Sequence, residues 1–321
     1  MRQDLVKYRQ KNVISARFAE LESINIDFIK INQKDIYVRN YPSLHKSDPP
    51  LSPDLSNFIE KTTYDNPKFI PSPRFQDFVR NQTYNFTDDL LITNPGLQDT
   101  TNNNVIAQFK VMKTLFKNSS VRDYAMYSML KYDLRNYGLK VPKTVVTEFL
   151  KDCRQLDYKK DISDNYRIWS ELAAGLPAPA FLLPDKNGTS YNLNQFKGKY
   201  IYIDVWATWC GPCLEEMSAL EKLVSKFSHQ ANKIAFIKIS IDLNKTAWLN
   251  KIISVTESGT INLHAIDGAN SKFAKAYVIN DIPRYILIDD NGNIVNANAL
   301  APSSSLIDDT IANLLKKAND K

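Results

Sequence analysis

The stretch DVWATWCGPC, residues 204–213, contains two of the three cysteines of the chain, separated by two residues. A pair with this spacing can be a redox-active dithiol, one half of a zinc site or a structural disulfide. A zinc site would need a second pair of ligands, but the three histidines are scattered and none is near the cysteines. A permanent disulfide would close so short a loop that it would stabilise the fold only weakly. The lack of further zinc ligands and the short loop therefore favour a redox-active dithiol over a zinc site or a structural disulfide.

The residues around the pair place it between a strand and a helix. The apolar run YIYIDVW, residues 200–206, predicts a buried strand, and apolar residues at helical spacing follow over 217–227. The N-terminus of a helix has unpaired N–H groups and a partial positive charge, and both stabilise a thiolate. We expect Cys210, at the exposed edge of this turn, to be the nucleophile and Cys213, one turn into the helix, to be the resolving thiol. Pro212 suits the first helical turn, where its missing N–H costs nothing.

The chain from residue 173 onward alternates short apolar runs with helical patterns. The predicted order is a β-hairpin followed by β-α-β-α-β-α-β-β-α, with Asn291–Gly292 at the turn of the second hairpin. This α/β order predicts a central sheet covered on both faces, with parallel pairing in the β-α-β part. The predicted segments after the first strand are a strand at 233–241, a helix at 246–255, a strand at 261–266, a helix at 271–279, a hairpin at 284–299 and a helix at 304–318.

The first half of the chain follows a different pattern. Apolar side chains recur at helical spacing over 105–116, 124–137 and 146–153. Ser52–Pro53 and Ser72–Pro73 each resemble an N-cap followed by proline in the first helical turn. With 321 residues, the chain is too long for one ordinary core. We therefore predict two domains, a mostly α-helical domain at 1–172 and an α/β domain at 173–321.

Composition narrows the classes of function. The net charge of +6 is modest and the basic residues form no block, which argues against a nucleic-acid partner. The sequence contains no run of 18 consecutive apolar residues, so we predict no transmembrane helix. The first residues, MRQDLVKYRQ, have no apolar stretch typical of a signal peptide, which fits either a cytosolic protein or a mature exported form. Cys153, on an apolar helical stripe, is expected to be a buried, inert thiol.

The motif WATWCGPC after a buried strand, together with Ile-Pro before a later strand, resembles the thioredoxin superfamily. The segments GLPAPAFLLPDKNGTSYNLNQFKGKY and AYVINDIPRYILIDDNGNIV narrow the resemblance to the TlpA/ResA-like thiol-disulfide oxidoreductases over about residues 173–321. The resemblance implies a thioredoxin-like fold with Cys210 and Cys213 as the redox pair and with no cofactor beyond their disulfide. It also implies that Pro283 is a cis-proline facing the active site. The substrate-binding residues it implies are Trp209, Gly211, Pro212, Ile282 and Pro283.

Two carboxylates are candidates for proton transfer near the thiols. Asp204 matches a buried acid that in thioredoxins helps to move the proton of the resolving thiol, whereas many TlpA/ResA-like proteins have asparagine there. Glu216 matches an acidic position that ResA-like proteins use near the thiols. The alternatives are that Asp204 is a strand-end acid bonded to the backbone and that Glu216 is an ordinary charge on a helix face. A buried, unpaired carboxylate would have a raised pKa, which suits proton transfer.

The function implied by the resemblance is reduction of protein disulfides through a mixed disulfide. The Gly211–Pro212 dipeptide is that of reducing thioredoxins, so we expect a reductase acting on protein substrates and recharged by an unknown thiol electron donor. The alternative is a partner-binding or chaperone-like protein in which the helical domain captures a ligand and the redox pair is secondary. We expect a periplasmic or cell-envelope location, with a signal segment or membrane tether in the full-length precursor. A native start at Met1 would favour the cytoplasm.

Overall fold

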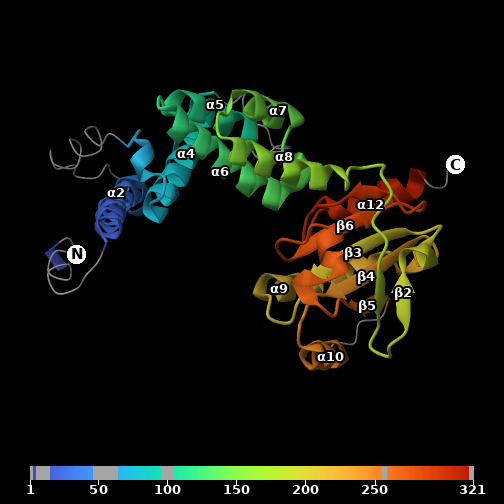
Figure 1. Cartoon of the computed structure of the whole chain (residues 1–321). Helices are drawn as coiled ribbons and strands as arrows, with labels where there is room; N and C mark the ends of the chain where they lie inside the picture. Colours follow the sequence, from blue (N-terminus) through green and yellow to red (C-terminus); the bar gives the residue numbers. More distant parts are fainter. Residues whose placement is uncertain (1–2, 5–14, 46–63, 95–103, 255–258, 318–321) are drawn as a thin grey trace. The chain divides into compact units, whose positions relative to one another are not determined.

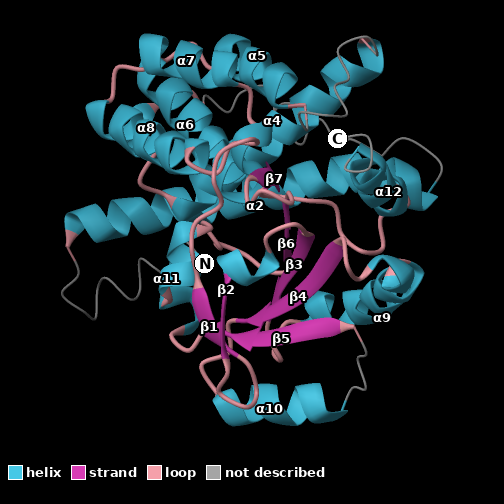
Figure 2. Cartoon of the chain, turned by 90° about the vertical axis from the view of Figure 1, so that its right-hand side faces the viewer, coloured by secondary structure: helices cyan, strands magenta, loops and turns pink. Residues whose placement is uncertain are grey.

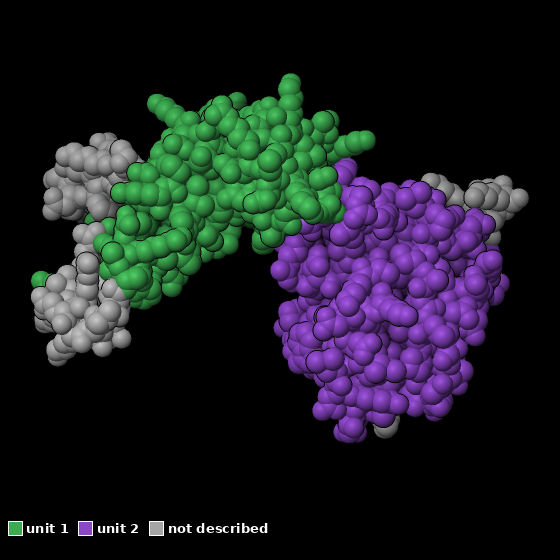
Figure 3. All heavy atoms as spheres, viewed as in Figure 1, with its two compact units in different colours: residues 1–133, 140–164 green, residues 134–139, 165–321 purple. Residues whose placement is uncertain are grey.

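The structure is a computed structural model that describes residues 3–4, 15–45, 64–94, 104–254 and 259–317. The contacts between residues divide the chain into two compact units (Figure 3). The first unit contains residues 1–133 and 140–164, and the second contains 134–139 and 165–321. The last turns of two helices that begin in the first unit therefore belong to the second. The N-cap predicted at Ser52 lies outside the described residues.

The first unit is built from helices, as predicted (Figure 1). Three of them confirm the apolar stripes noted in the sequence, and Ser72 caps a fourth by accepting a hydrogen bond from the amide of Phe75 at 3.2 Å, with Pro73 in the first turn. Two further helices carry no stripe that we had singled out. The described α-helices are α2 (Ala16–His45), α4 (Pro73–Thr93), α5 (Val105–Leu115), α6 (Ser119–Tyr137), α7 (Lys143–Asp152) and α8 (Leu156–Ser170).

The second unit has the predicted alternation of strands and helices (Figure 2). Its five-stranded sheet has the order β5-β4-β3-β6-β7, and a separate antiparallel hairpin pairs β1 with β2. Strand β3 is parallel to β4, β4 is parallel to β5, and β6 is antiparallel to β3 and to β7. The strands are β1 (Leu182–Pro184), β2 (Ser190–Asn192), β3 (Tyr200–Trp206), β4 (Ile234–Ser240), β5 (Thr260–His264), β6 (Arg284–Ile288) and β7 (Ile294–Asn296). The helices are α9 (Gly211–Lys226), α10 (Lys245–Ser254), α11 (Lys272–Ala276) and α12 (Ile307–Lys317).

One predicted helix is much shorter than its sequence pattern. Helix α11 ends at Ala276 instead of continuing to residue 279, because Val278 adopts a φ of 52°, in the left-handed region that a helix cannot accommodate. The second hairpin turns as predicted at Asn291–Gly292, where Gly292 has a φ of 86°.

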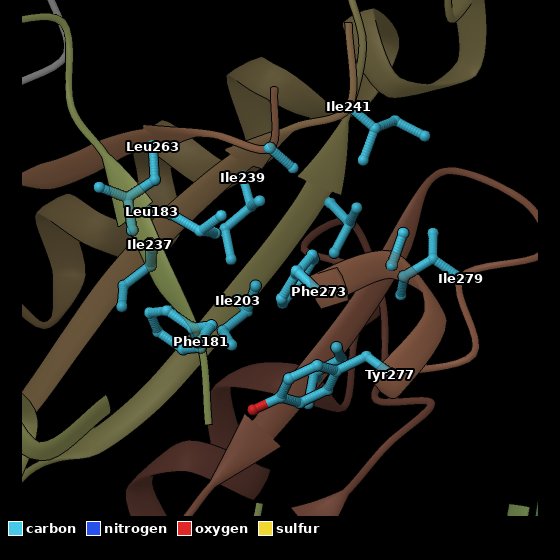
Figure 4. Close-up of a cluster of buried hydrophobic side chains, with 14 of the residues drawn as sticks. Phe181, Leu183, Ile203, Ile237, Ile239, Ile241, Leu263, Phe273, Tyr277 and Ile279 are labelled. Atoms are coloured by element: carbon cyan, nitrogen blue, oxygen red, sulfur yellow. The ribbon is translucent and has the colours of Figure 1, made fainter. Parts of the chain in front are cut away.

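Apolar side chains cover both faces of the sheet, as the sequence predicts. Every residue of the central strand β3 is buried, and successive side chains point to opposite faces. Ile203 contributes to one cluster, which Figure 4 shows together with Phe181, Ile237 and Phe273 from the surrounding elements. Tyr202 contributes to the other, whose members come mainly from the sheet and from helices α9 and α12. The end of a central strand packed on both faces is a rigid support for the turn that follows it.

No helix among the described residues is long and apolar enough to cross a membrane.

Candidate active site

The cysteine pair lies at the start of helix α9, as the sequence predicts. Cys210 and Cys213 are joined by a disulfide. Cys210 is the N-cap residue, and its sulfur accepts a hydrogen bond from the amide of Cys213 at 3.2 Å. Pro212 lies in the first turn of the helix, and its ring and Gly211 are exposed. A sulfur that already receives a helix N-terminal N–H is in the environment that stabilises a thiolate once the disulfide is reduced.

The expectation that Cys210 stands at an exposed edge is wrong. Its exposed fraction is 5%, close to the 2% of Cys213. The strand-to-helix turn folds back onto the sheet, so that both cysteines belong to the apolar cluster that also contains Trp206 and Ala207. Because Cys210 is almost fully buried, the surface around it determines how a substrate disulfide can reach its sulfur.

A groove of about 710 Å³ provides that neighbouring surface. Trp209, next to Cys210, forms part of its wall and is 68% exposed. The opposite chain segment, Ile279–Ile282, leads directly to Pro283, and the Ile282–Pro283 peptide bond is cis. The predicted substrate-binding residues Trp209 and Ile282 thus line one groove. The other lining residues are Thr208, Ile241, Asp242, Leu243, Asn244, Ala247 and Ala269.

A buried carboxylate fixes the loop that leads into Cys210. Asp242, 1% exposed, accepts hydrogen bonds from the amide of Thr208 at 3.0 Å and from its hydroxyl at 2.6 Å. The Ser240 hydroxyl donates a further bond to this carboxylate at 2.7 Å. The backbone carbonyl of Asp242 accepts from Nε2 of the buried His264 at 2.7 Å. The segment that follows strand β4 therefore holds Thr208, two positions before Cys210, through bonds to a charged group, which are stronger than neutral ones.

Asp204 is buried within the sheet, as predicted. Its exposed fraction is 5%, and it pairs in register with Lys238 on β4 and with Tyr285 on β6. Lys238 is itself only 2% exposed, and its Nζ lies 4.7 Å from the centre of the Trp206 ring. A buried acid and a buried lysine are thus neighbours in register on the two central parallel strands, β3 and β4.

Glu216 lies on helix α9, one turn beyond Cys213, and is partly buried. Its carboxylate accepts hydrogen bonds from the hydroxyl of Ser303 at 2.6 Å and from its amide at 3.0 Å. Burial raises the pKa of Tyr285, and the negative charges of Asp204 and Glu216 raise it further. Both carboxylates therefore act on one phenol, which places them in the same neighbourhood of the molecule.

Three buried polar residues of this region were not singled out in the sequence. Lys238 interrupts the apolar run KIAFIKISI. A lysine inside a predicted buried strand could have been noted as unusual, because lysine is rarely fully buried. Asp242 follows the same strand by two residues, and its importance is evident only from its hydrogen bonds to Thr208. Arg284 follows Pro283 directly and is 5% exposed, which its sequence position does not suggest.

The remaining cysteine is in the first unit. Cys153 is buried, as predicted, and burial raises the pKa of its thiol. Within the described residues, no three His, Cys, Asp or Glu side chains come together as a metal site would require.

Known proteins resemble the second unit. The Redoxin family matches residues 173–314. The thiol-disulfide oxidoreductase ResA of Bacillus subtilis (strain 168) is 28% identical over 145 residues, which cover 45% of this chain and 77% of the relative. ResA of Bacillus thuringiensis (strain Al Hakam) is 30% identical over 125 residues, which cover 39% of this chain and 69% of the relative. A solved structure from Bacteroides vulgatus, described as a candidate thiol-disulfide oxidoreductase, is 40% identical. The match covers 45% of this chain and 99% of that one, with a TM-score of 0.42.

A disulfide that caps a helix after the central strand of this sheet defines a thioredoxin-like oxidoreductase domain. The chain belongs to the TlpA/ResA-like thiol-disulfide oxidoreductases, and its thioredoxin-like domain is preceded by a mostly helical region. The family predicted from the WATWCGPC motif and the segments around it is thereby confirmed.

Proposed function

We propose that this oxidoreductase reduces disulfides in protein substrates through the dithiol form of Cys210 and Cys213, without a further cofactor. The Cys210 thiolate attacks one sulfur of the substrate disulfide, the substrate S–S bond breaks, and the departing thiolate takes up a proton. The Cys213 thiolate then attacks the Cys210 sulfur of the mixed disulfide and releases the second substrate thiol. Two electrons pass to the substrate, and the pair ends as the disulfide seen in the structure.

The observation that carries this proposal is the hydrogen bond from the Cys213 amide to the Cys210 sulfur at the start of α9, beside an open apolar groove. The bond and the helix N-terminus favour the thiolate of Cys210, which is the species that attacks a disulfide. The groove offers an extended substrate chain a surface next to Trp209 and Ile282. Gly211 and Pro212 are exposed on the same turn and present no long side chain to a substrate.

Asp204 is proposed to accept the proton of Cys213 as that thiol attacks the mixed disulfide. Asp204 is a buried acid on the strand that leads to the cysteine turn, and a positioned carboxylate is a suitable acceptor for such a proton. Glu216 is proposed to adjust the charge around the same site, since it acts with Asp204 on Tyr285. Its bonds to Ser303 hold its carboxylate in place while it does so.

The direction of electron flow is proposed from the Gly211–Pro212 dipeptide. Reducing thioredoxins have potentials of about −270 mV, against about −120 mV for the strong oxidant DsbA. An unidentified thiol donor would return the pair to its dithiol form. Equilibration with glutathione measures the potential, and a value above about −150 mV would overturn the assignment as a reductase.

The mechanism is tested by trapping. A Cys213→Ala variant cannot resolve the mixed disulfide, so native extracts should yield reductant-sensitive adducts on Cys210. The Cys210→Ser variant, which lacks the nucleophile, is the matched control and should yield none. Equal adducts on both variants would contradict the assignment of Cys210 as nucleophile. Full function in vivo with Cys210→Ser would instead favour a binding role for the protein.

We also propose that the protein works in the periplasm or cell envelope, with a signal segment or membrane tether in its precursor. Fractionation of cells that express the gene from its native start codon tests this location. Recovery of the protein in the cytosolic fraction alone would overturn it.

A further inference from the structure

Two residues that precede the Redoxin region contact the loop that carries the cis-proline. Residues 134–139 and 165–172 belong to the second unit although the family match begins at residue 173. We propose that Arg135 and Trp169, from these two segments, are positioning residues that hold the Asn280–Arg284 loop at the substrate groove. The inference rests on the proposed function for its consequence, but the contacts that support it are independent of the redox chemistry.

Arg135 binds the loop through a two-pronged ion pair. Its Nε donates to Oδ2 of Asp281 at 3.0 Å and its Nη2 donates to Oδ1 at 3.1 Å. The same Nη2 donates to the carbonyl of Asn280 at 3.3 Å. Asn280 and Asp281 both line the groove. Both charged side chains are more than half exposed, so the pair adds little to overall stability. Its planar three-bond geometry instead fixes where the loop lies.

Trp169 holds the other end of the loop through Arg284. The Arg284 guanidinium lies 4.7 Å from the centre of the Trp169 ring, in a cation–π contact. Its Nε donates to the carbonyl of Ala297 at 2.7 Å, and burial lowers the pKa of Arg284 to about 10. Because Arg284 directly follows Pro283, this buried side chain constrains the backbone on the C-terminal side of the proline.

The segment 134–139 is itself fixed to the second unit. A Cβ on Gly138 would lie 2.6 Å from the Trp169 ring, so the backbone there is in close contact with the indole. The carbonyl of Asn136 accepts a hydrogen bond from Nδ2 of Asn298 at 2.9 Å. Arg135 therefore projects from a segment anchored on both sides, and it can act as a fixed support for the loop.

Two substitutions at Arg135 test the role. Arg135→Gln removes the charge and the fork, whereas Arg135→Lys keeps a charge but not the bidentate geometry. The matched control is Arg167→Gln, because Arg167 pairs with Glu171 at 3.0 Å on the same unit with similar exposure and touches no groove residue through that pair. Steady-state rates are measured with insulin, a protein disulfide, and with 5,5′-dithiobis(2-nitrobenzoic acid), a small one.

We expect Arg135→Gln to raise the KM for insulin about 3- to 10-fold, with a smaller effect on the small disulfide. Arg135→Lys should recover part of the loss, and Arg167→Gln should behave as wild type. A change in a merely structural residue would affect both substrates alike. An unchanged KM for insulin in Arg135→Gln, or equal losses with both substrates, would overturn the proposal.

Amide hydrogen exchange tests the positioning without using activity. In the oxidised protein, Arg135→Gln should increase exchange at the amides of residues 280–282, and Trp169→Phe, which keeps an aromatic face, should increase it at 284–285. If wild-type protein reduced neither disulfide, the proposed function would fail while this measurement still decided the inference. Exchange that matches wild type in both variants would refute it.

Discussion

Asp133 provides a test of how burial couples pH to the stability of the helical unit. It lies on α6 with an exposed fraction of 3%, and its Oδ2 has no hydrogen-bond partner among the described residues. Burial raises the pKa of Asp133 from its ordinary value of 3.8 to about 7. The folded protein therefore keeps this proton over a range in which the unfolded chain has already lost it.

The sign and size of the effect follow from that difference. Between pH 4 and pH 7 the folded state binds one more proton than the unfolded state, so the free energy of unfolding falls as pH rises. A difference of about 3 pKa units corresponds to about 4 kcal/mol in the free energy of unfolding. This contribution is present below pH 4 and is fully lost above pH 7. Asp133→Asn has nearly the same shape and cannot ionise. It should match wild type near pH 4 and be more stable by about 2–4 kcal/mol at pH 8.

Urea unfolding followed by far-UV circular dichroism at pH 4.5, 6 and 8 measures this difference. A gain of 2–4 kcal/mol corresponds to a midpoint shift of about 1–2 M urea. All four tryptophans lie in the second unit, so their fluorescence reports that unit separately. Asp88→Asn, at an exposed position on α4, is the control for loss of one negative charge. A stability difference between Asp133→Asn and wild type that is the same at pH 4.5 and pH 8 would refute the reasoning.

Three further predictions concern the second unit. Asp242→Asn should lower the stability of the second unit by about 2–3 kcal/mol, because three bonds to a buried charge become bonds to a neutral amide. Urea midpoints from tryptophan fluorescence measure the loss, and a loss under about 0.5 kcal/mol would contradict the prediction. Gly138→Ala should lower the stability of the second unit by more than about 2 kcal/mol, since Gly138 has a φ of 56° and the new Cβ would meet the buried Trp169 ring. The same fluorescence assay measures the loss, with exposed Gly188→Ala as a comparison that adds no clash. Asp204→Asn should slow resolution of the mixed disulfide near pH 7 in rapid-quench measurements, and an unchanged rate would leave Asp204 a structural residue.

The thioredoxin-like domain could be predicted from the sequence because its signals are local. Strand β3 is an apolar run interrupted only by Asp204, and the turn at Asn291–Gly292 is set by the backbone freedom of glycine. The cysteine pair falls where a strand pattern ends and a helical one begins. These patterns specify the elements, their order and the capping position of Cys210 without reference to distant residues. The same holds for Ser72, whose hydroxyl caps the helix that Pro73 begins.

Contacts between distant segments decided the rest. The burial of Cys210 depends on how its turn packs against the sheet, which the amphipathic pattern of α9 does not contain. The bond between Thr208 and Asp242 joins residues 34 positions apart, and the pair Arg135–Asp281 joins residues 146 apart. Sequence periodicity records which face of an element is apolar, but it does not record which neighbour that face meets. The sequence by itself therefore determined the chemistry of the cysteine pair, whereas only the tertiary structure decided which polar residues surround the groove and hold it in place.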